Sequence, residues 1–150
     1  MNPVVVPVPT VRVPTVRYAG DEMFIATTAS GHAIAVDTKG DRKAAPGPLE
    51  LFLAGIACCT ATDVISVLLK KRLQVSSYHV EIHTQRREEH PRRFERIELK
   101  HIIRGTDVPA DAVARAIELS STKYCSAIAT VRPTAEVVSS FVIEAETVLV

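Results

Sequence analysis

Two cysteines, Cys59 and Cys125, carry the residue chemistry that most distinguishes this chain. Cys59 lies within 48–61, a run that is apolar on nearly every side of a helix, and Cys125 lies in the segment 123–126. A single buried thiol usually behaves as a small hydrophobic side chain. Two thiols that meet in the fold can instead cycle between a dithiol and a disulfide. The residues alone leave both interpretations open.

A cysteine in the middle of a helix needs a cation from another segment to stabilise its thiolate form. The helix dipole favours negative charge only in the first turn. The neighbouring Cys58 points about 100° away around the helix, so the two thiols are not expected to serve one site, and Cys58 is expected to pack in the core. Basic residues that could supply the cation lie in the loop before the helix and on the first strand: Lys39, Arg42, Lys43, Arg12 and Arg17.

Metal and nucleotide chemistry have little support in the sequence. His79 and His83 share one face of a predicted strand, but residues four apart on a strand are roughly 13 Å apart, which is too far for one ion. The chain has neither a Gly-rich phosphate loop nor a Gly-x-Ser-x-Gly nucleophile motif. We therefore expect no metal and no cofactor.

The composition is that of a globular protein, with 47% hydrophobic and 23% charged residues over 150 residues. A formal net charge of +1 gives no reason to expect nucleic acid or an anionic membrane as a partner. The three cysteines are too few for a disulfide scaffold, and 1–14 lacks a signal peptide pattern, so a cytoplasmic location is expected. We expect one domain over 1–150, preceded by an extended, Pro- and Val-rich arm at 1–14.

Hydrophobic periodicity predicts the order strands, helix, strand pair, helix, strand. The long helix is expected over 49–72, and alternation predicts a hairpin whose inner face carries Ile97, Leu99, His101 and Ile103. Asp107 is expected to cap the following helix. The remaining strands are predicted at 11–28, 32–37 and 135–144, and a short helix at 125–131. This order is typical of an α+β fold with a largely antiparallel sheet.

The helix sequence from Pro48 to Ala61 resembles the signature helix of the OsmC/Ohr family, the osmotically inducible and organic hydroperoxide resistance proteins. The Tyr124-Cys125 pair after its amphipathic helix resembles the second signature of that family. The resemblance spans about residues 15–145 and includes the Ser30-Gly31-His32 turn and the charged hairpin at 86–91.

The resemblance implies an OsmC-like fold in which curved sheets wrap two central helices of an intertwined homodimer, with active sites at the dimer interface. It implies that Cys59 is the peroxidatic cysteine of a thiol-dependent hydroperoxide reductase acting in oxidative stress defence. Cys125 would then resolve the sulfenic acid to a disulfide, and a dithiol would reduce that disulfide.

Two positions depart from the family pattern. The hydroperoxide reductases carry a catalytic glutamate directly after the signature proline, where this chain has Leu49, and Glu50 follows one residue later. Their thiolate-orienting arginine has no clear counterpart, and Arg42 is nominated ahead of Lys39. The alternative is a non-enzymatic, dimeric, stress-related binding protein whose thiols are structural or redox-sensing.

Overall fold

The computed structural model describes residues 13–145, so most of the predicted arm at 1–14 lies outside the described residues. The chain divides into two units, one ending at Phe52 and the other beginning at Leu53, and each is described by itself. Helices and strands occur together as predicted, which confirms the α+β class. The assignment of 1–150 to a single domain stays a prediction.

The first unit is a three-stranded antiparallel sheet in the order β1-β2-β3, formed by Thr15–Gly20, Met23–Thr27 and Ala33–Asp37. The single strand predicted over 11–28 is therefore wrong, since a turn divides it. Asp21 and Glu22 make this turn with φ values of 46° and 57°. Most residues avoid such angles, and the usual sequence signal for the turn is Asn-Gly or Asp-Gly, which is missing here.

The long helix α1, Pro48–Lys70, has specific signals at both ends. Proline suits the first helical position because its missing N–H would have no partner there. At the other end the N–H of Leu73 bonds the carbonyl of Leu68, and the N–H of Arg72 bonds that of Leu69. With Arg72 at a φ of 60°, this is a Schellman motif without its usual glycine.

Only one stripe of α1 is buried within this chain, formed by Ile56, Ala57, Thr60, Val64 and Leu68. Other apolar side chains of the helix are not covered by this chain: Leu69 is 57% exposed, and Leu49 and Phe52 are also exposed. By length and composition the helix could cross a membrane. The buried stripe of α1 packs on a sheet of the same chain, so we interpret α1 as a core helix and not as a membrane-spanning one.

The second unit contains a three-stranded sheet in the order β4-β5-β6, made by Gln74–Arg86, Phe94–Thr106 and Glu136–Ala145. The β4–β5 hairpin is antiparallel and has the predicted inner face, with Val80 opposite His101 and Ile82 opposite Leu99. β6 pairs with β5 in parallel. The sequence predicted a largely antiparallel sheet and gave no indication of this parallel pair. The parallel pairing follows from the helical connection that carries the chain back to the start of β5.

That connection comprises α2 (Ala110–Leu119), the π-helical turn η1 (Ser120–Tyr124) and α3 (Ser126–Val131). The predicted cap by Asp107 is wrong, because Pro109 is the N-cap residue and no side chain caps the helix. Asp107 instead adopts a φ of 49° in the preceding turn. The π-helical turn separates α2 from α3.

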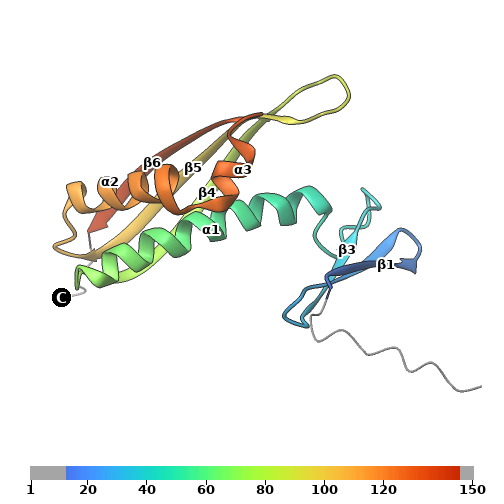
Figure 1. The fold of residues 1–150 in the computed structure, drawn as a ribbon, viewed down its shortest axis with the longest axis horizontal. Coiled ribbons are helices and arrows are strands. Elements are labelled where there is room, and N and C mark those ends of the chain that lie inside the picture. The colour runs from blue at the N-terminus through green and yellow to red at the C-terminus, as the bar shows by residue number, and fades with distance from the viewer. Residues whose placement is uncertain (1–12, 146–150) are drawn as a thin grey trace, which may run out of the picture. The chain divides into compact units, whose positions relative to one another are not determined.

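Helices α1, α2 and α3 lie on the same face of the β4-β5-β6 sheet (Figure 1). The odd-numbered residues of β5 from Ile97 to Ile103 are fully buried against them, as their alternation predicts. One apolar cluster joins Ile56, Leu99 and Ile128, and a second joins Leu68, Ile103 and Val113. Burial of these side chains supplies the main driving force that holds α1 to the sheet.

His101 is the polar member of this buried row. Its Nδ1 lies 2.7 Å from the Tyr78 hydroxyl oxygen, and its Nε2 has no hydrogen-bond partner among the described residues. Burial lowers the pKa of His101 to about 4 and raises that of Tyr78. His101 is therefore a neutral core histidine bonded to Tyr78.

We expect acid to weaken the fold through His101. Its folded pKa of about 4 lies below the ordinary value of 6.5, so its contribution to stability is full above pH 6.5 and is lost as pH falls toward 4. The slope reaches at most about 1.4 kcal/mol per pH unit. Urea unfolding between about pH 4.5 and 7 should show a shallower pH slope for His101→Leu than for the unsubstituted protein. Equal slopes would contradict this account.

Candidate active site

Cys59 is half-buried on α1, beside the fully buried stripe, and packs against the cluster that contains Ile97 and Leu99. The helical turn places Cys58 on a different side, as predicted from the 100° rotation per residue. Cys58 is exposed in this chain, so the expectation that it packs in the core is wrong here. The apolar surroundings of the two thiols in the sequence concealed this difference.

Cys125 is buried at 2% exposure, at the junction of η1 and α3. It is the N-cap residue of α3, and its Sγ accepts a hydrogen bond from the N–H of Ile128 at 3.4 Å. Its own N–H donates to the carbonyl of Ser120 at 2.9 Å, which closes the π-helical turn. Both bonds fix the direction in which this thiol points.

The structure brings the two cysteines together on the helical side of the sheet. Cys59 packs against the apolar cluster of which Cys125 is a member. The pKa of Cys125 is raised to about 11, chiefly by burial and to a smaller extent by the nearby Cys59 side chain, while the Ile128 N–H opposes the rise. Cys125 is therefore a protonated thiol at neutral pH, and Cys59 is the better exposed of the two.

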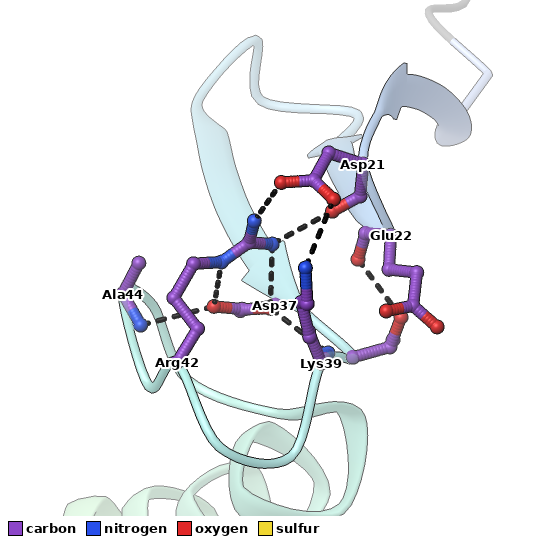
Figure 2. Close-up of polar contacts among 7 residues, drawn as sticks. Asp21, Glu22, Asp37, Lys39, Arg42 and Ala44 are labelled. Carbon is purple, nitrogen blue, oxygen red and sulfur yellow. Dashed lines mark hydrogen bonds and ion pairs between the residues drawn. The ribbon is translucent and has the colours of Figure 1, made fainter.

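Arg42 and Lys39, the nominated cations, lie in the first unit in a network built around Asp37 (Figure 2). The Asp37 side chain is 1% exposed and accepts hydrogen bonds from Arg42 Nε and Nη2, both at 2.9 Å. Arg42 also pairs with the carboxylate of Asp21, and Lys39 Nζ lies 3.3 Å from that carboxylate.

The Arg42 guanidinium holds the pKa of Asp37 well below its usual range. Backbone N–H groups of Lys39 and Ala44 add to this effect by bonding the same carboxylate, at 2.9 Å and 3.0 Å. The network ties the loop before α1 to the end of β3. Arg42 is thus bonded to two carboxylates, and its role toward a thiolate stays a prediction.

Glu50, the third nominated supporting residue, serves the start of α1. Its carboxylate accepts a hydrogen bond of 2.7 Å from the N–H of Gly47, which precedes the helix. This is one half of a capping box, in which the third helical residue reaches back to the N-cap. Leu49, at the position of the family's glutamate, is exposed.

A buried hydrogen-bond chain that the sequence analysis did not single out joins α1 to η1. Thr60 Oγ1 lies 2.9 Å from Ser120 Oγ, and Ser120 Oγ donates to Asp63 Oδ2 at 2.9 Å. Thr60 is 1% exposed and Ser120 is 0% exposed. The available signal was the helical spacing that places Ser120 on the inner face of its helix with Val113 and Ala116.

Among residues 13–145, no group of three or more His, Cys, Asp and Glu side chains is arranged to hold a metal ion.

Comparison with known proteins shows the family to which the chain belongs. A family model described as OsmC-like protein matches residues 39–140. Protein YhfA of Escherichia coli K12 is 43% identical over 112 residues, which cover 74% of this chain and 82% of that protein. The chain belongs to the OsmC-like protein family.

Solved structures agree with this fold. A hypothetical protein from Aquifex aeolicus VF5 aligns with a TM-score of 0.80 at 32% identity, over 92% of this chain and 99% of that one. An organic hydroperoxide resistance protein from Elizabethkingia anophelis aligns with a TM-score of 0.67 at 17% identity, over 91% and 100%. The second likeness is one of fold alone.

The environment of Cys125 predicts a distinctive labelling profile. In the reduced protein, alkylation of Cys125 by iodoacetamide should keep accelerating up to about pH 11, because the pKa of this thiol is raised from 9.0 to about 11. Peptide-resolved mass spectrometry after short labelling pulses would measure it, with the urea-denatured protein as control. A Cys125 profile in the folded protein that coincides with the denatured control would contradict the raised pKa.

Proposed function

We propose that this protein is a thiol-dependent hydroperoxide reductase of the OsmC-like type, acting in oxidative stress defence. Cys59 is the peroxidatic cysteine and Cys125 the resolving cysteine. The observation that carries the proposal is the proximity of the two thiols: Cys59 on α1 packs against the apolar cluster of which Cys125, at the start of α3, is a member. Membership of the OsmC-like family supports it, and so does the name of the Elizabethkingia anophelis protein of the same fold.

The environments of the two thiols support this assignment of roles. Cys125 is almost fully buried, and its raised pKa keeps it protonated at neutral pH, so it is the poorer initial nucleophile. Cys59 is partly exposed on the same side of the sheet, where a peroxide can reach it. The apolar cluster against which Cys59 packs, which includes Ile97 and Leu99, favours an organic hydroperoxide over a strongly hydrated one.

The reaction is a two-electron reduction of the peroxide. The Cys59 sulfur attacks one peroxide oxygen, the O–O bond breaks, and the products are a sulfenic acid on Cys59 and an alcohol. The Cys125 sulfur then attacks the Cys59 sulfur, and the hydroxyl leaves as water with the proton of the Cys125 thiol. An external dithiol reduces the resulting disulfide by thiol–disulfide exchange and is itself oxidised to a disulfide.

The supporting groups belong to the same proposal. Arg42 is nominated as the cation that favours the Cys59 thiolate, ahead of Lys39, with Glu50 as the nearest carboxylate in sequence to the family's glutamate. Asp37, at the end of β3, and Asp21, in the β1–β2 turn, bond Arg42 and hold its guanidinium in one place. The cytoplasm, a reducing compartment, would supply the dithiol.

The alternative function, a dimeric binding protein with structural or redox-sensing thiols, draws on two observations. Leu49 occupies the position of the family's catalytic glutamate, and the pKa of Cys125 is raised. Both features would slow a peroxidase. Turnover of a hydroperoxide with a dithiol reductant separates the two functions.

We further propose that the protein is a homodimer with α1 at the interface. This helix leaves apolar side chains exposed near both of its ends, Leu49 and Phe52 near the start and Leu69 near the end. A second copy of the chain would cover them. The family resemblance implies the same arrangement.

Light scattering at micromolar concentration should give a mass about twice the 16.3 kDa of one chain. The expected cause is burial of the exposed side of α1 between two copies. A well-folded particle with the mass of one chain would remove the dimer from the account.

Substitution of each cysteine tests the proposed reaction. Cys59→Ser should abolish consumption of an organic hydroperoxide with a dithiol reductant, because the attacking sulfur is lost. Cys58→Ala is the matched control one residue away and should retain turnover within about twofold. Treatment of the unsubstituted protein with one equivalent of hydroperoxide should link the peptides that contain Cys59 and Cys125. Loss of turnover in Cys58→Ala with activity retained in Cys59→Ser would show that the helix register is wrong by one residue.

A further inference from the structure

We infer that Ser120 is a positioning residue for the redox pair: with Thr60 and Asp63 it holds the Cys125 segment against the Cys59 helix and thereby sets the balance between dithiol and disulfide. This inference deepens the proposed function and rests on it for the redox consequence. Ser120 acts through the two cysteine-bearing segments and not on a substrate.

The direction of the hydrogen bonds follows from the number of protons available. Ser120 has one hydroxyl proton, which it donates to Asp63 Oδ2 at 2.9 Å. In the contact of 2.9 Å between Thr60 and Ser120, Thr60 must therefore be the donor. The chain runs from the Thr60 hydroxyl through Ser120 to the Asp63 carboxylate, so one side chain of η1 is fastened to two positions on α1.

These hydrogen bonds, which we call the Ser120 bridge, connect the two segments that carry the cysteines. Thr60 directly follows Cys59 on α1. Ser120 begins η1, and its carbonyl accepts the N–H of Cys125, at 2.9 Å, across the wide π-helical turn. Ser120 thus controls Cys125 through its backbone and α1 through its side chain. Single π-helical turns inside helices are frequently found at functional sites.

Because the Ser120 bridge is buried, it favours one register of η1 along α1 over the others. Thr60 and Ser120 lie in the apolar interior, where an unpaired hydroxyl costs free energy. A slip of η1 along α1 would break both side-chain bonds and leave these groups unsatisfied. The bridge therefore selects one register between the segments that carry the two thiols.

Fixed register raises the effective concentration of one thiol at the other, which favours the disulfide. The equilibrium is Cys59–SH plus Cys125–SH plus oxidised dithiothreitol, giving the protein disulfide plus reduced dithiothreitol. Two electrons and two protons pass from the protein to the reagent. No peroxide takes part, so this equilibrium reports on the geometry of the pair independently of turnover.

The test compares Ser120→Ala with Ser121→Ala in dithiothreitol redox buffers, with alkylation and peptide mass as the readout. Ser120→Ala should lower the equilibrium constant for the Cys59–Cys125 disulfide about tenfold, the effect expected when a hydrogen bond to a charged group is lost. Ser121→Ala is the matched control, because that hydroxyl donates to the nearby carbonyl of Glu118, at 3.1 Å, and not to a residue of α1. It should leave the constant unchanged.

Two substitutions at Thr60 distinguish the contribution of its hydroxyl group from that of its side-chain packing. Thr60→Val keeps the shape and removes the donor, whereas Thr60→Ser keeps the donor and removes a methyl group. We expect the disulfide constant to fall in Thr60→Val and to stay near that of the unsubstituted protein in Thr60→Ser. Equal effects of both substitutions would overturn the inference, as would an unchanged constant in Ser120→Ala.

A second readout distinguishes this inference from the proposed function. In the fully reduced protein, Ser120→Ala should increase the rate of Cys125 alkylation several-fold at a fixed pH, because the segment that buries this thiol is released. If the unsubstituted protein forms no disulfide between Cys59 and Cys125, the proposed function fails. The inference then depends on the alkylation rate: an increase supports positioning by Ser120, and an unchanged rate overturns it.

Discussion

The contact between the buried stripe of α1 and the inner face of β5 is the interaction on which the rest of the second unit depends. Fully buried aliphatic side chains on both elements form two clusters along this contact, one toward each end of the helix. Core side chains of this kind contribute about 2–5 kcal/mol each when they are truncated, so the clusters fix how far along the sheet each turn of α1 lies. The positions of Cys59 and Thr60 relative to the sheet follow from this register of α1.

The polar groups of the core occur between and beside these clusters. His101 is bonded to Tyr78 within the buried row of β5, and the Thr60–Ser120–Asp63 chain joins α1 to the π-helical turn. A buried polar group without its partner is costly, so such bonds tolerate fewer alternative packings than aliphatic contacts do. The aliphatic contacts hold the layers together, and the polar bonds select one arrangement, in which Cys59 packs against the cluster that contains Cys125.

The sequence predicts most of the second unit because periodicity reports directly on burial. Alternation along β5 correctly placed Ile97, Leu99, His101 and Ile103 on one face, and the long helix was located to within two residues at each end. Three features escaped prediction for physical reasons. The Asp21–Glu22 turn uses positive φ angles without glycine, the parallel pairing of β6 depends on tertiary packing, and Cys58 and Cys59 have similar apolar neighbours in sequence but different exposure. The bridge through Ser120 required the coordinates, because no local pattern specifies its partners on α1.

The central claim is that Cys59 is oxidised first and that Cys125 resolves the product. Trapping the intermediate in Cys125→Ser tests this most directly, since that variant cannot form the disulfide. After one equivalent of an organic hydroperoxide, the peptide that contains Cys59 should gain one oxygen atom and react with a sulfenic-acid-specific dione, with Cys58→Ala included in the same chain so that the site is unambiguous. Failure of Cys59 to gain oxygen under these conditions, with the peroxide left unconsumed, would contradict the account.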